Sequence, residues 1–469
     1  MDRTLQSIVE FSTMTRADEI PAEVLTQATA ILTDSLACAV GGRDCMGAEV
    51  AKRFPAQPTG LGGAVIGTGT PYTPDIAAFW NTSMIRYLDY NDTFTGGHPS
   101  DMIGALVATS LKYSGVDVLR AIVVAYEVFH RVQKRMRAFG SDSEARVNYL
   151  STDQGFAVAI GATAGMCNLF GFDRDTTRHA VSLAATHGLP LRASRAGELS
   201  HYKGVATAVS ARHAVFCCHM AESGLTAPDA PFEGRHGLME VMAGAAQPAE
   251  LDAFGDWAIL RSGLKYFPVT ANCQIAAWAA LDLRKLIAPS EVESVTLRTS
   301  RFLKHESGSE PAKWSPRTRE TADHSLPFVF STSLRDGDIS MESFEPGKLH
   351  DPELASLMDK ISIEVDEEIE SEWPDVIQIR VEADTANGAR HVVHLRDPKG
   401  TYRNPMTRSD IQRKYVALVG PALGEPQAIE SFEAAWETSR APSFATVLET
   451  LALTRPDAPA EQRASYPAE

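Results

Sequence analysis

Cysteine is scarce in this chain: six residues among 469, none of them in a CxxC pair. That spacing excludes a disulfide framework and indicates buried, reduced thiols in a cytoplasmic protein. It also leaves no cysteine set for an iron–sulfur cluster. The sequence has no HExxH or comparable histidine and carboxylate spacing, so it predicts neither a metal nor a cofactor.

Positive charge and long apolar runs are also lacking. Lysine and arginine number 44 against 60 acidic residues, a formal net charge of −16. Nucleic acid is excluded as a partner, because neutralising phosphates requires clustered cations. No apolar run approaches the roughly 18 residues of a membrane span, and the first four residues lack a signal-peptide pattern. We therefore expect a protein that contacts neither nucleic acid nor a membrane.

What the chain has is length and clear periodicity. A chain of 469 residues favours two domains. The first half predicts helices over Pro21–Val40, where a Gly-Gly pair follows, and over Leu119–Arg137 and Gly155–Phe170. The last of these carries small residues on most faces, which is typical of a helix packed closely inside a bundle.

The pattern changes after about residue 265. Apolar residues alternate over 294–298, 360–365, 376–383 and 390–395, and Asn387-Gly388 separates the last two runs as a hairpin signal. The sequence thus predicts a mainly α protein: an all-helical main domain followed by a smaller α+β domain built on an antiparallel sheet. From about Asn404 the chain returns to helix.

A polar segment from Asp89 to Asp101 lies between two helical patterns. It contains three carboxylates, an amide, several hydroxyls and His98, and we expect Ser100 to act as the N-cap of the second helix. A helix end with a core behind it and water in front is one interpretation. By spacing alone, Asp89 and Asp92 could equally be solvated helix-end groups and His98 a loop residue.

The order of residues in this segment resembles a known family. Asp89-Tyr90-Asn91-Asp92-Thr93 followed by His98-Pro99-Ser100-Asp101 is similar to the signature of the MmgE/PrpD family, which includes 2-methylcitrate dehydratase, cis-aconitate decarboxylase and iminodisuccinate epimerase. Four further segments match in order and extend the resemblance over roughly residues 5 to 420: 197–204, 227–234, 322–328 and 398–406.

The resemblance implies an arrangement of domains. We expect a helical main domain over residues 1–265, an α/β lid domain over 266–403, helices over 404–455 that rejoin the main domain, and a disordered tail over 456–469, which is rich in Ala, Pro and Glu. The resemblance further implies a homodimer and a site between main domain and lid.

The family moves protons next to carboxylates of small polycarboxylates. A positioned acid and base serve that chemistry, and cations stabilise the charge that develops. We predict Asp89 and His98 as the proton-transfer groups. By resemblance, Lys203 binds a carboxylate or polarises the intermediate, although an exposed lysine at a helix start has the same spacing. Asn91, Asp92 and Thr93 would orient the substrate or the Asp side chains.

Three other residues are ambiguous by sequence. Arg192 and Arg195 would bind substrate carboxylates, but surface ion pairs are an equal alternative. His324 lies in the Ala322–Phe328 segment, where it would line the site or serve as a hydrogen-bonded structural histidine.

Three positions depart from the family pattern as we place it. Gln154 takes the place of a histidine before the Gly155–Phe170 helix, Asn272 (or Gln274, in a shifted register) takes that of a second histidine, and Phe328 that of a tyrosine. Glutamine and asparagine keep hydrogen-bonding capacity but transfer no proton, and phenylalanine does neither. We therefore expect these residues to line the substrate site without acid–base roles.

These observations predict a cofactor-independent hydro-lyase acting on a small polycarboxylate such as 2-methylcitrate. A decarboxylase of the cis-aconitate type or an epimerase of the same family is the first alternative. A catalytically weakened homologue that serves as a binding protein is the second.

Overall fold

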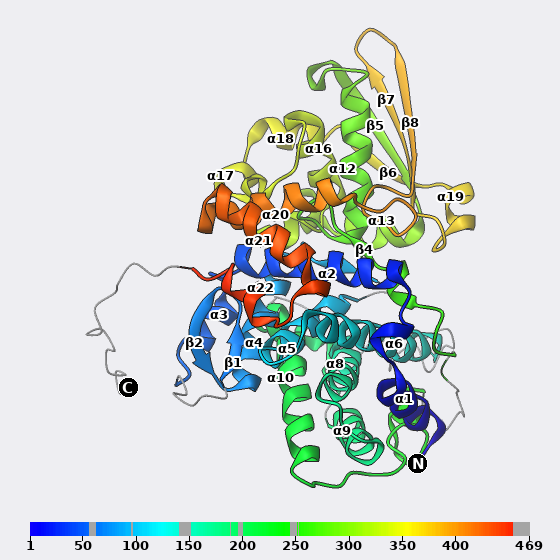
Figure 1. Ribbon diagram of the computed structural model, residues 1–469. Helices are drawn as coiled ribbons and strands as arrows, with labels where there is room; N and C mark the ends of the chain where they lie inside the picture. The colour runs from blue at the N-terminus through cyan, green and yellow to red at the C-terminus, as the bar shows by residue number, and fades with distance from the viewer. Residues whose placement is uncertain are drawn as a thin grey trace, which may run out of the picture.

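The computed structural model describes residues 1–55, 62–94, 97–139, 152–187, 189–195, 200–243, 251 and 253–453. The N-terminal part is helical (Figure 1). Its elements are α1 (Arg3–Met14), η1 (Ala17–Glu19), α2 (Ala22–Gly41), α3 (Met46–Ala51), α4 (Pro74–Tyr87), η2 (Pro99–Met102), α5 (Ile103–Ala108), α6 (Gly115–Phe139), α8 (Gly155–Phe170), α9 (Arg174–Thr186), η3 (Arg192–Arg195), α10 (Tyr202–Glu222), α11 (Leu238–Ala243) and η4 (Ala258–Arg261).

Helix α8 lies inside this part because its small residues allow close approach to α6. A Cβ on Gly165 would come within 2.7 Å of the Ala121 carbonyl oxygen, and one on Gly161 within 2.9 Å of that of Ala125. The helix ends where Gly171 takes the left-handed conformation, at φ 69°. Its bounds are those expected from the sequence.

Helix α2 runs across the boundary between the two parts of the molecule, with the last helices of the chain over it (Figure 1). It is long and apolar enough to cross a membrane by length and composition, contrary to our expectation of no such run, but 78% of its apolar window is buried inside the protein. The C-terminal helices are α20 (Arg408–Leu423), α21 (Glu425–Trp436), η7 (Thr438–Arg440) and α22 (Ala445–Glu449). Their buried residues belong to the same apolar core as those of α2.

A second apolar core lies in the α/β part and spans residues 267 to 393. Its elements are α12 (Ala271–Arg284), η5 (Pro289–Glu291), β5 (Val292–Thr299), α13 (Arg301–Gly308), α14 (Pro311–Trp314), α15 (Arg319–Ala322), α16 (Leu326–Asp336), η6 (Met341–Phe344), α17 (Pro346–Leu349), α18 (Pro352–Met358), β6 (Ile361–Val365), α19 (Glu367–Glu372), β7 (Gln378–Thr385) and β8 (Arg390–Arg396). Helices α12 and α16 pack together beside the sheet.

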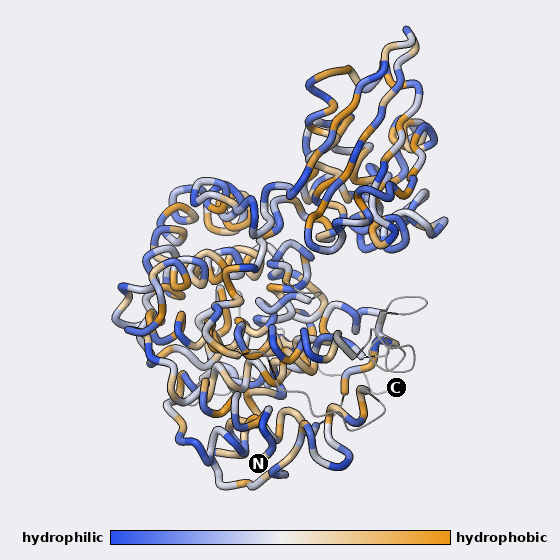
Figure 2. The backbone as a smooth tube through the Cα atoms, turned by 90° about the vertical axis from the view of Figure 1, so that its right-hand side faces the viewer, coloured by the Kyte–Doolittle hydropathy of each residue, from blue (hydrophilic) through white to orange (hydrophobic). Residues whose placement is uncertain are grey.

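The sheet of this part has the strand order β6-β5-β7-β8. From Ile379 onward, buried residues alternate with half-buried ones along β7. Figure 2 shows hydrophobic and hydrophilic residues following one another along the strands of this part. The hairpin at Asn387-Gly388 is present, with Gly388 at φ 82°. The expectation of a purely antiparallel sheet is wrong, because β5 and β6 pair in parallel, from Val295 opposite Ile361 to Thr299 opposite Val365. The chain between them crosses over through α13 to α18, which permits this direction.

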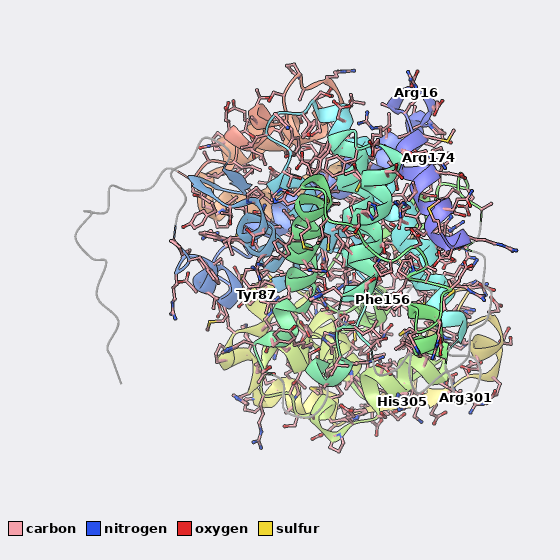
Figure 3. The ribbon with its side chains drawn as sticks, turned by 90° about the horizontal axis from the view of Figure 1, so that it is seen from below. Arg16, Tyr87, Phe156, Arg174, Arg301 and His305 are labelled. Carbon is pink, nitrogen blue, oxygen red and sulfur yellow. The ribbon has the colours of Figure 1, made fainter. Side chains whose placement is uncertain are left out.

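Charged side chains lie on separate elements of both parts of the molecule. Seen from the helical end, Arg16 and Arg174 lie at one edge and Arg301 and His305 of α13 at another (Figure 3). Arg174 pairs with Glu10 at 2.9 Å and so ties α9 to α1.

Two short strand pairs complete the fold. Strands β1 (Gly63–Val65) and β2 (Thr68–Tyr72) form a hairpin. Strand β3 (Asp92–Thr93) pairs with β4 (Gly263–Leu264), which is the last element before the α/β part begins. This second pair brings the chain near residue 265 alongside the Asp89–Asp101 segment, and thereby positions the candidate site.

Candidate active site

The candidate site is built on the loop that follows α4. Asp89 adopts a left-handed backbone conformation, φ 48°, directly after the helix. Such a conformation is uncommon for a residue with a Cβ and is found mainly where the surroundings enforce it. Of the two interpretations of this segment, that of solvated helix-end groups is wrong: Asp89, Asn91, Asp92, Ser100 and Asp101 are all buried.

Two cations hold the Asp89 carboxylate. Arg86, one helical turn earlier, pairs with its Oδ1 atom, and Lys265 Nζ lies 3.1 Å from the same oxygen. Burial alone would raise the pKa of Asp89, but the charges of Lys265 and Arg86 outweigh burial and hold this pKa well below its usual range. Asp89 is therefore ionised at neutral pH.

His98 faces this ion pair with a defined tautomer. Its Nδ1 atom lies 2.7 Å from the Asp92 carbonyl oxygen, which can only accept, so Nδ1 carries the proton. The opposite nitrogen, Nε2, lies 3.7 Å from Asp89 Oδ1. Burial, followed by the charges of Arg86 and Lys265, lowers the pKa of His98 well below its ordinary value. A neutral His98 thus turns an Nε2 lone pair toward the Asp89 carboxylate.

A second histidine approaches from the α/β part. His324 lies between α15 and α16, and its Nδ1 atom contacts the Asp323 carboxylate. Its Nε2 atom is 3.9 Å from Asp89 Oδ2, and 30% of the side chain is exposed. The two Nε2 atoms therefore flank the two oxygens of one carboxylate, one from each part of the molecule, and the His324 side is the one that water reaches.

The remaining polar groups of the loop bond to one another. Ser100 Oγ donates to Asp92 Oδ1 at 2.6 Å, and the Tyr126 hydroxyl donates to Asp92 Oδ2 at 2.7 Å. Burial raises the pKa of Asp92 to about 6. Asn91 Nδ2 donates to Ser100 Oγ at 2.8 Å and to Asp101 Oδ1 at 3.1 Å. We had expected Ser100 to be a helix N-cap. That expectation is wrong, because its hydroxyl donates to Asp92 instead.

Gln154 lies beside His98, at the start of α8. Its Oε1 atom accepts from the His98 backbone N–H at 2.7 Å, and its Nε2 atom donates to Asp101 Oδ2 at 3.4 Å. A Cβ on Gly97 would come within 2.1 Å of Gln154 Oε1, so the loop can approach α8 only with glycine at that position. Thr93 is half-buried in β3, opposite Gly263.

Other predicted residues lie outside this cluster. The ion-pair partners of Asp89 among the described residues are Arg86, Lys265, His98 and His324; Lys203, half-buried in the first turn of α10, is not one of them. Arg192 is exposed in η3, and the side chain of Arg195 lies outside the described residues.

Two of the departures from the family pattern belong to helices of the α/β part. Phe328 is fully buried in the core of the α/β part, with its ring 6.0 Å from that of Phe344, and its place beside the substrate stays a prediction. Asn272 is half-buried in the first turn of α12. Gln274, the other register, uses its amide to bind the backbone of Tyr266, Phe267 and Val269. Gln274 therefore has a structural role.

The sequence analysis missed Arg86, Lys265 and Asp323. Arg86 carried a weak signal, since it precedes Asp89 by three residues at a helix end. Asp323 is adjacent to His324 in a segment already singled out. Lys265 had no local signal, because 176 residues separate it from Asp89.

Asp89, Asp323 and His324 offer ligand atoms within 4.8 Å of one another, a spacing that could suit a cation. Arg86 and Lys265 both pair with Asp89, so a divalent ion there would meet two positive charges at close range. These two cations disfavour a metal ion at the Asp89 carboxylate.

Two surface cavities lie elsewhere on the molecule, and their lining residues do not provide this chemistry. One, of about 580 Å³, is lined by Arg174, Arg178, His179 and Asp229, and the other, of about 470 Å³, by residues of α1 with Phe254 and Trp257. In the first, Arg178 pairs with Asp229 and Arg174 with Glu10, so its cations are already neutralised.

Comparison with known proteins gives concordant matches along the chain. The family models for the MmgE/PrpD N-terminal domain and C-terminal domain match residues 6–251 and 267–438. A 2-methylcitrate dehydratase of Salmonella typhi is 26% identical over 70% of this chain and 71% of its own length. An alkylcitrate dehydratase of Talaromyces stipitatus is 26% identical over 83% and 84%. A cis-aconitate decarboxylase-like protein of Aspergillus oryzae is 26% identical over 93% and 94%.

Proposed function

Because the chain belongs to the MmgE/PrpD family, we propose that it is a lyase that removes water from a small hydroxy-polycarboxylate such as 2-methylcitrate. The dehydratases among its relatives support the reaction class. The observation that carries the proposal is the pair of histidine Nε2 atoms on either side of the Asp89 carboxylate, next to two buried cations.

The difficult step is loss of a proton next to a carboxylate. The anion formed carries a second negative charge beside the first, so nearby cations stabilise it as it develops. Lys265, 1% exposed, and Arg86 supply such charge in a buried setting, where it acts more strongly than in water. A substrate carboxylate that approaches them replaces part of the interaction with Asp89.

We assign the base to His98, because its neutral ring presents the Nε2 lone pair and its other nitrogen is fixed on the Asp92 carbonyl. Asp89 stabilises the imidazolium once the proton has moved. His324 with Asp323 is the acid that protonates the departing hydroxide, since a carboxylate at Nδ1 stabilises the charged ring. The departing water carries the proton from His324, and His98 keeps the proton taken from carbon. Both histidines then exchange these protons with water before the next turnover, so the net change is loss of water and no redox partner is required.

Asn91, Asp92, Thr93 and Gln154 serve this assignment as supports. Gln154 and the Asp92 carbonyl hold the backbone and the ring of His98, and Ser100 links Asn91 to Asp92. Lys203, Arg192, Arg195 and Asn272 are assigned to binding distal carboxylates. Cofactor independence follows from this set as part of the proposal.

Domain organisation is proposed on the same lines, with residues 1–265 as main domain, 266–403 as lid and 404–455 as returning helices. Two separate apolar cores support this division. The tail over 456–469 lies outside the described residues.

We further propose a cytoplasmic homodimer. Six free, buried cysteines fit a reducing compartment, and Tyr202, Val209 and Phe216 expose an apolar stripe at seven-residue spacing on α10.

The test is incubation of the purified protein with 2-methylcitrate, citrate and cis-aconitate in D2O with EDTA, followed by proton NMR. We expect an alkene to form from a hydroxy-acid, and His98→Ala to abolish it. Itaconate from cis-aconitate would replace the proposal with a decarboxylase, a possibility that the Aspergillus relative raises. Deuterium exchange without net product would favour an epimerase. A rise in melting temperature without any reaction would indicate a binding protein.

A further inference from the structure

Three successive carbonyl oxygens of the Asp89 loop each accept a hydrogen bond from a cation. Arg319 donates to Leu88 O at 2.8 Å, Lys265 to Asp89 O at 2.6 Å and Lys414 to Tyr90 O at 2.6 Å. The three donors come from three segments far apart in the sequence: α15, the chain after β4, and α20. Cations are favourable here because these carbonyls follow the negative C-terminal end of α4.

These three hydrogen bonds lie at Asp89, whose backbone conformation is unfavourable, and at the residues on either side of it. Asp89 is the residue at φ 48°, a conformation that costs free energy for any residue with a Cβ and persists only when its neighbours enforce it. That conformation directs the carboxylate toward His98 and His324. The carbonyls on either side of it, those of Leu88 and Tyr90, accept hydrogen bonds from Arg319 and Lys414. Among the described residues, neither of these two cations forms an ion pair with the Asp89 carboxylate.

Lys414 is the more deeply placed of the two. It is buried, and its Nζ atom pairs with Asp34 Oδ1 at 2.6 Å, donates to Lys265 O at 3.0 Å and lies 3.9 Å from the centre of the Tyr90 ring. It therefore contacts the backbone of the Asp89 loop and that of Lys265 at once. The separation of these two backbone segments in turn sets the 3.1 Å distance between Lys265 Nζ and Asp89 Oδ1.

Arg319 reaches the loop from the α/β part. Its guanidinium lies 5.3 Å from the centre of the Tyr87 ring, labelled in Figure 3, and 5.9 Å from that of Phe344. Arg319 is the first residue of α15, and Asp323 and His324 follow the end of this one-turn helix. Arg319 thus couples the placement of His324 to the loop that carries Asp89.

We propose that Lys414 and Arg319 are positioning residues. They hold Asp89 in its left-handed conformation by donating hydrogen bonds to the carbonyl oxygens of Tyr90 and Leu88. They keep the Asp89 carboxylate within reach of Lys265 and the two histidines. The kinetic part of this inference rests on the proposed function, whereas its conformational part does not.

The variants must separate positioning from folding. Lys414→Met alone would leave the Asp34 carboxyl buried without its cation, a strongly destabilising change. The double variant Asp34→Leu/Lys414→Met removes both charges and fills the space with apolar groups, which buried ion pairs often tolerate. Arg319→Gln removes the second cation, and Arg319→Lys is the conservative variant that retains a donor. The control is Arg408→Gln on the same helix, whose partner Glu433 is exposed.

We expect kcat for 2-methylcitrate to fall about 100-fold in the double variant, in line with the effect of misplacing a group by about 1 Å, with KM changed less than about threefold. The acid limb of kcat/KM should move to higher pH, because the positive charge of Lys265 lowers the pKa of both the base His98 and the neighbouring Asp89, and both pKa values rise when Lys265 moves away. Arg319→Gln should do the same to a smaller extent, with partial recovery in Arg319→Lys. Arg408→Gln should match the wild type.

A crystal structure of the double variant gives a readout that does not depend on activity. We expect residue 89 to leave the left-handed region and Lys265 Nζ to lie beyond ion-pair distance of Asp89. An unchanged φ at residue 89, or a fall in kcat without movement of the acid limb, would overturn the inference. If the wild type leaves all three acids unreacted, the proposed function fails, and the conformation of residue 89 still decides whether the positioning residues act as described.

Discussion

Asp89 and Asp92 lie three residues apart in one loop, yet they face two different regions of the molecule. The Asp89 side contains cations and histidines from both parts of the chain: Arg86, Lys265, His98 and His324. The Asp92 side contains neutral hydroxyls, those of Ser100 and Tyr126, from the helical part alone. Both carboxyls are buried, so the difference between them comes from their partners.

That difference separates the acid–base properties of two identical groups. Burial raises the pKa of Asp92 to about 6, while the charges of Lys265 and Arg86 overcome burial at Asp89 and hold its pKa far lower. Pairs of titratable groups driven apart in this way are typical of active sites, where each takes one task. Here Asp89 holds charge next to the reacting groups, and Asp92 holds the His98 ring through its carbonyl and the loop through its side chain.

Removal of the Asp89 charge should have the largest effect. Asp89→Asn keeps the shape but leaves Arg86 and Lys265 without their shared anion, so kcat/KM should fall by about 1,000-fold or more, within the range for loss of proton-transfer machinery. Steady-state kinetics with 2-methylcitrate measures it. Activity within tenfold of the wild type would mean that Asp89 is only structural.

Substitution of each candidate lysine in turn, Lys265 or Lys203, should show the next largest effect on kcat/KM. Lys265→Met should reduce kcat/KM by about 100-fold and move its acid limb to higher pH, because the pKa values of the base His98 and of Asp89 both rise without the lysine charge. Lys203→Met should cost less than about tenfold and act mainly on KM, since Lys203 does not pair with Asp89. A larger loss of kcat/KM in Lys203→Met than in Lys265→Met would mean that Lys203, and not Lys265, acts on the reacting groups.

The Asp92 side should be visible in the pH dependence of stability. An unfolded aspartate titrates near pH 3.9, and Asp92 in the folded protein near 6. Its contribution is therefore full below about pH 4 and is lost as the pH rises through about 6, a change of about 3 kcal/mol. Asp89 has the opposite sign: its contribution is present above about pH 4 and is lost as the pH falls below that.

Asp92→Asn removes this contribution, so its free energy of unfolding relative to the wild type should improve by about 2 kcal/mol between pH 4 and 7. Urea unfolding at the two pH values measures the change. A constant difference between the two proteins would show that Asp92 has an ordinary pKa.

The smallest effect on catalysis is expected in the core of the α/β part. Phe328→Tyr restores the hydroxyl that the family pattern has, but the ring is fully buried against Phe344. The variant should lose about 1–3 kcal/mol of stability through overpacking and an unpaired hydroxyl, with kcat/KM unchanged. A gain in activity would place residue 328 at the substrate after all.

Much of this arrangement could be predicted from the sequence. The periodicity of α8, the Asn387-Gly388 hairpin and the change of pattern near residue 265 are local signals, and the structure has each of them. The parallel pairing of β5 and β6 was missed because strand direction depends on the path of the chain between them. Ser100 was assigned as an N-cap from its neighbours in sequence, whereas its hydroxyl bonds to Asp92.

The site was predicted in part for the same reason. Asp89 and His98 share one loop, and their motif carries a family pattern. Lys265 and Lys414 reach that loop from 176 and 324 residues away, and no spacing rule connects positions so distant. Gln154 was singled out as a departure from the family, but only the structure shows that it binds the backbone of His98.

The most direct test is a titration of the aspartate carboxyl carbons by carbon-13 NMR, with Asp89→Asn and Asp92→Asn to assign the two signals. The account predicts one carboxyl that titrates near pH 6 and disappears in Asp92→Asn, and another that stays ionised down to the lowest pH at which the protein is folded and disappears in Asp89→Asn. Two carboxyls titrating together near pH 4 would contradict it, because the cations around Asp89 would then not distinguish it from Asp92.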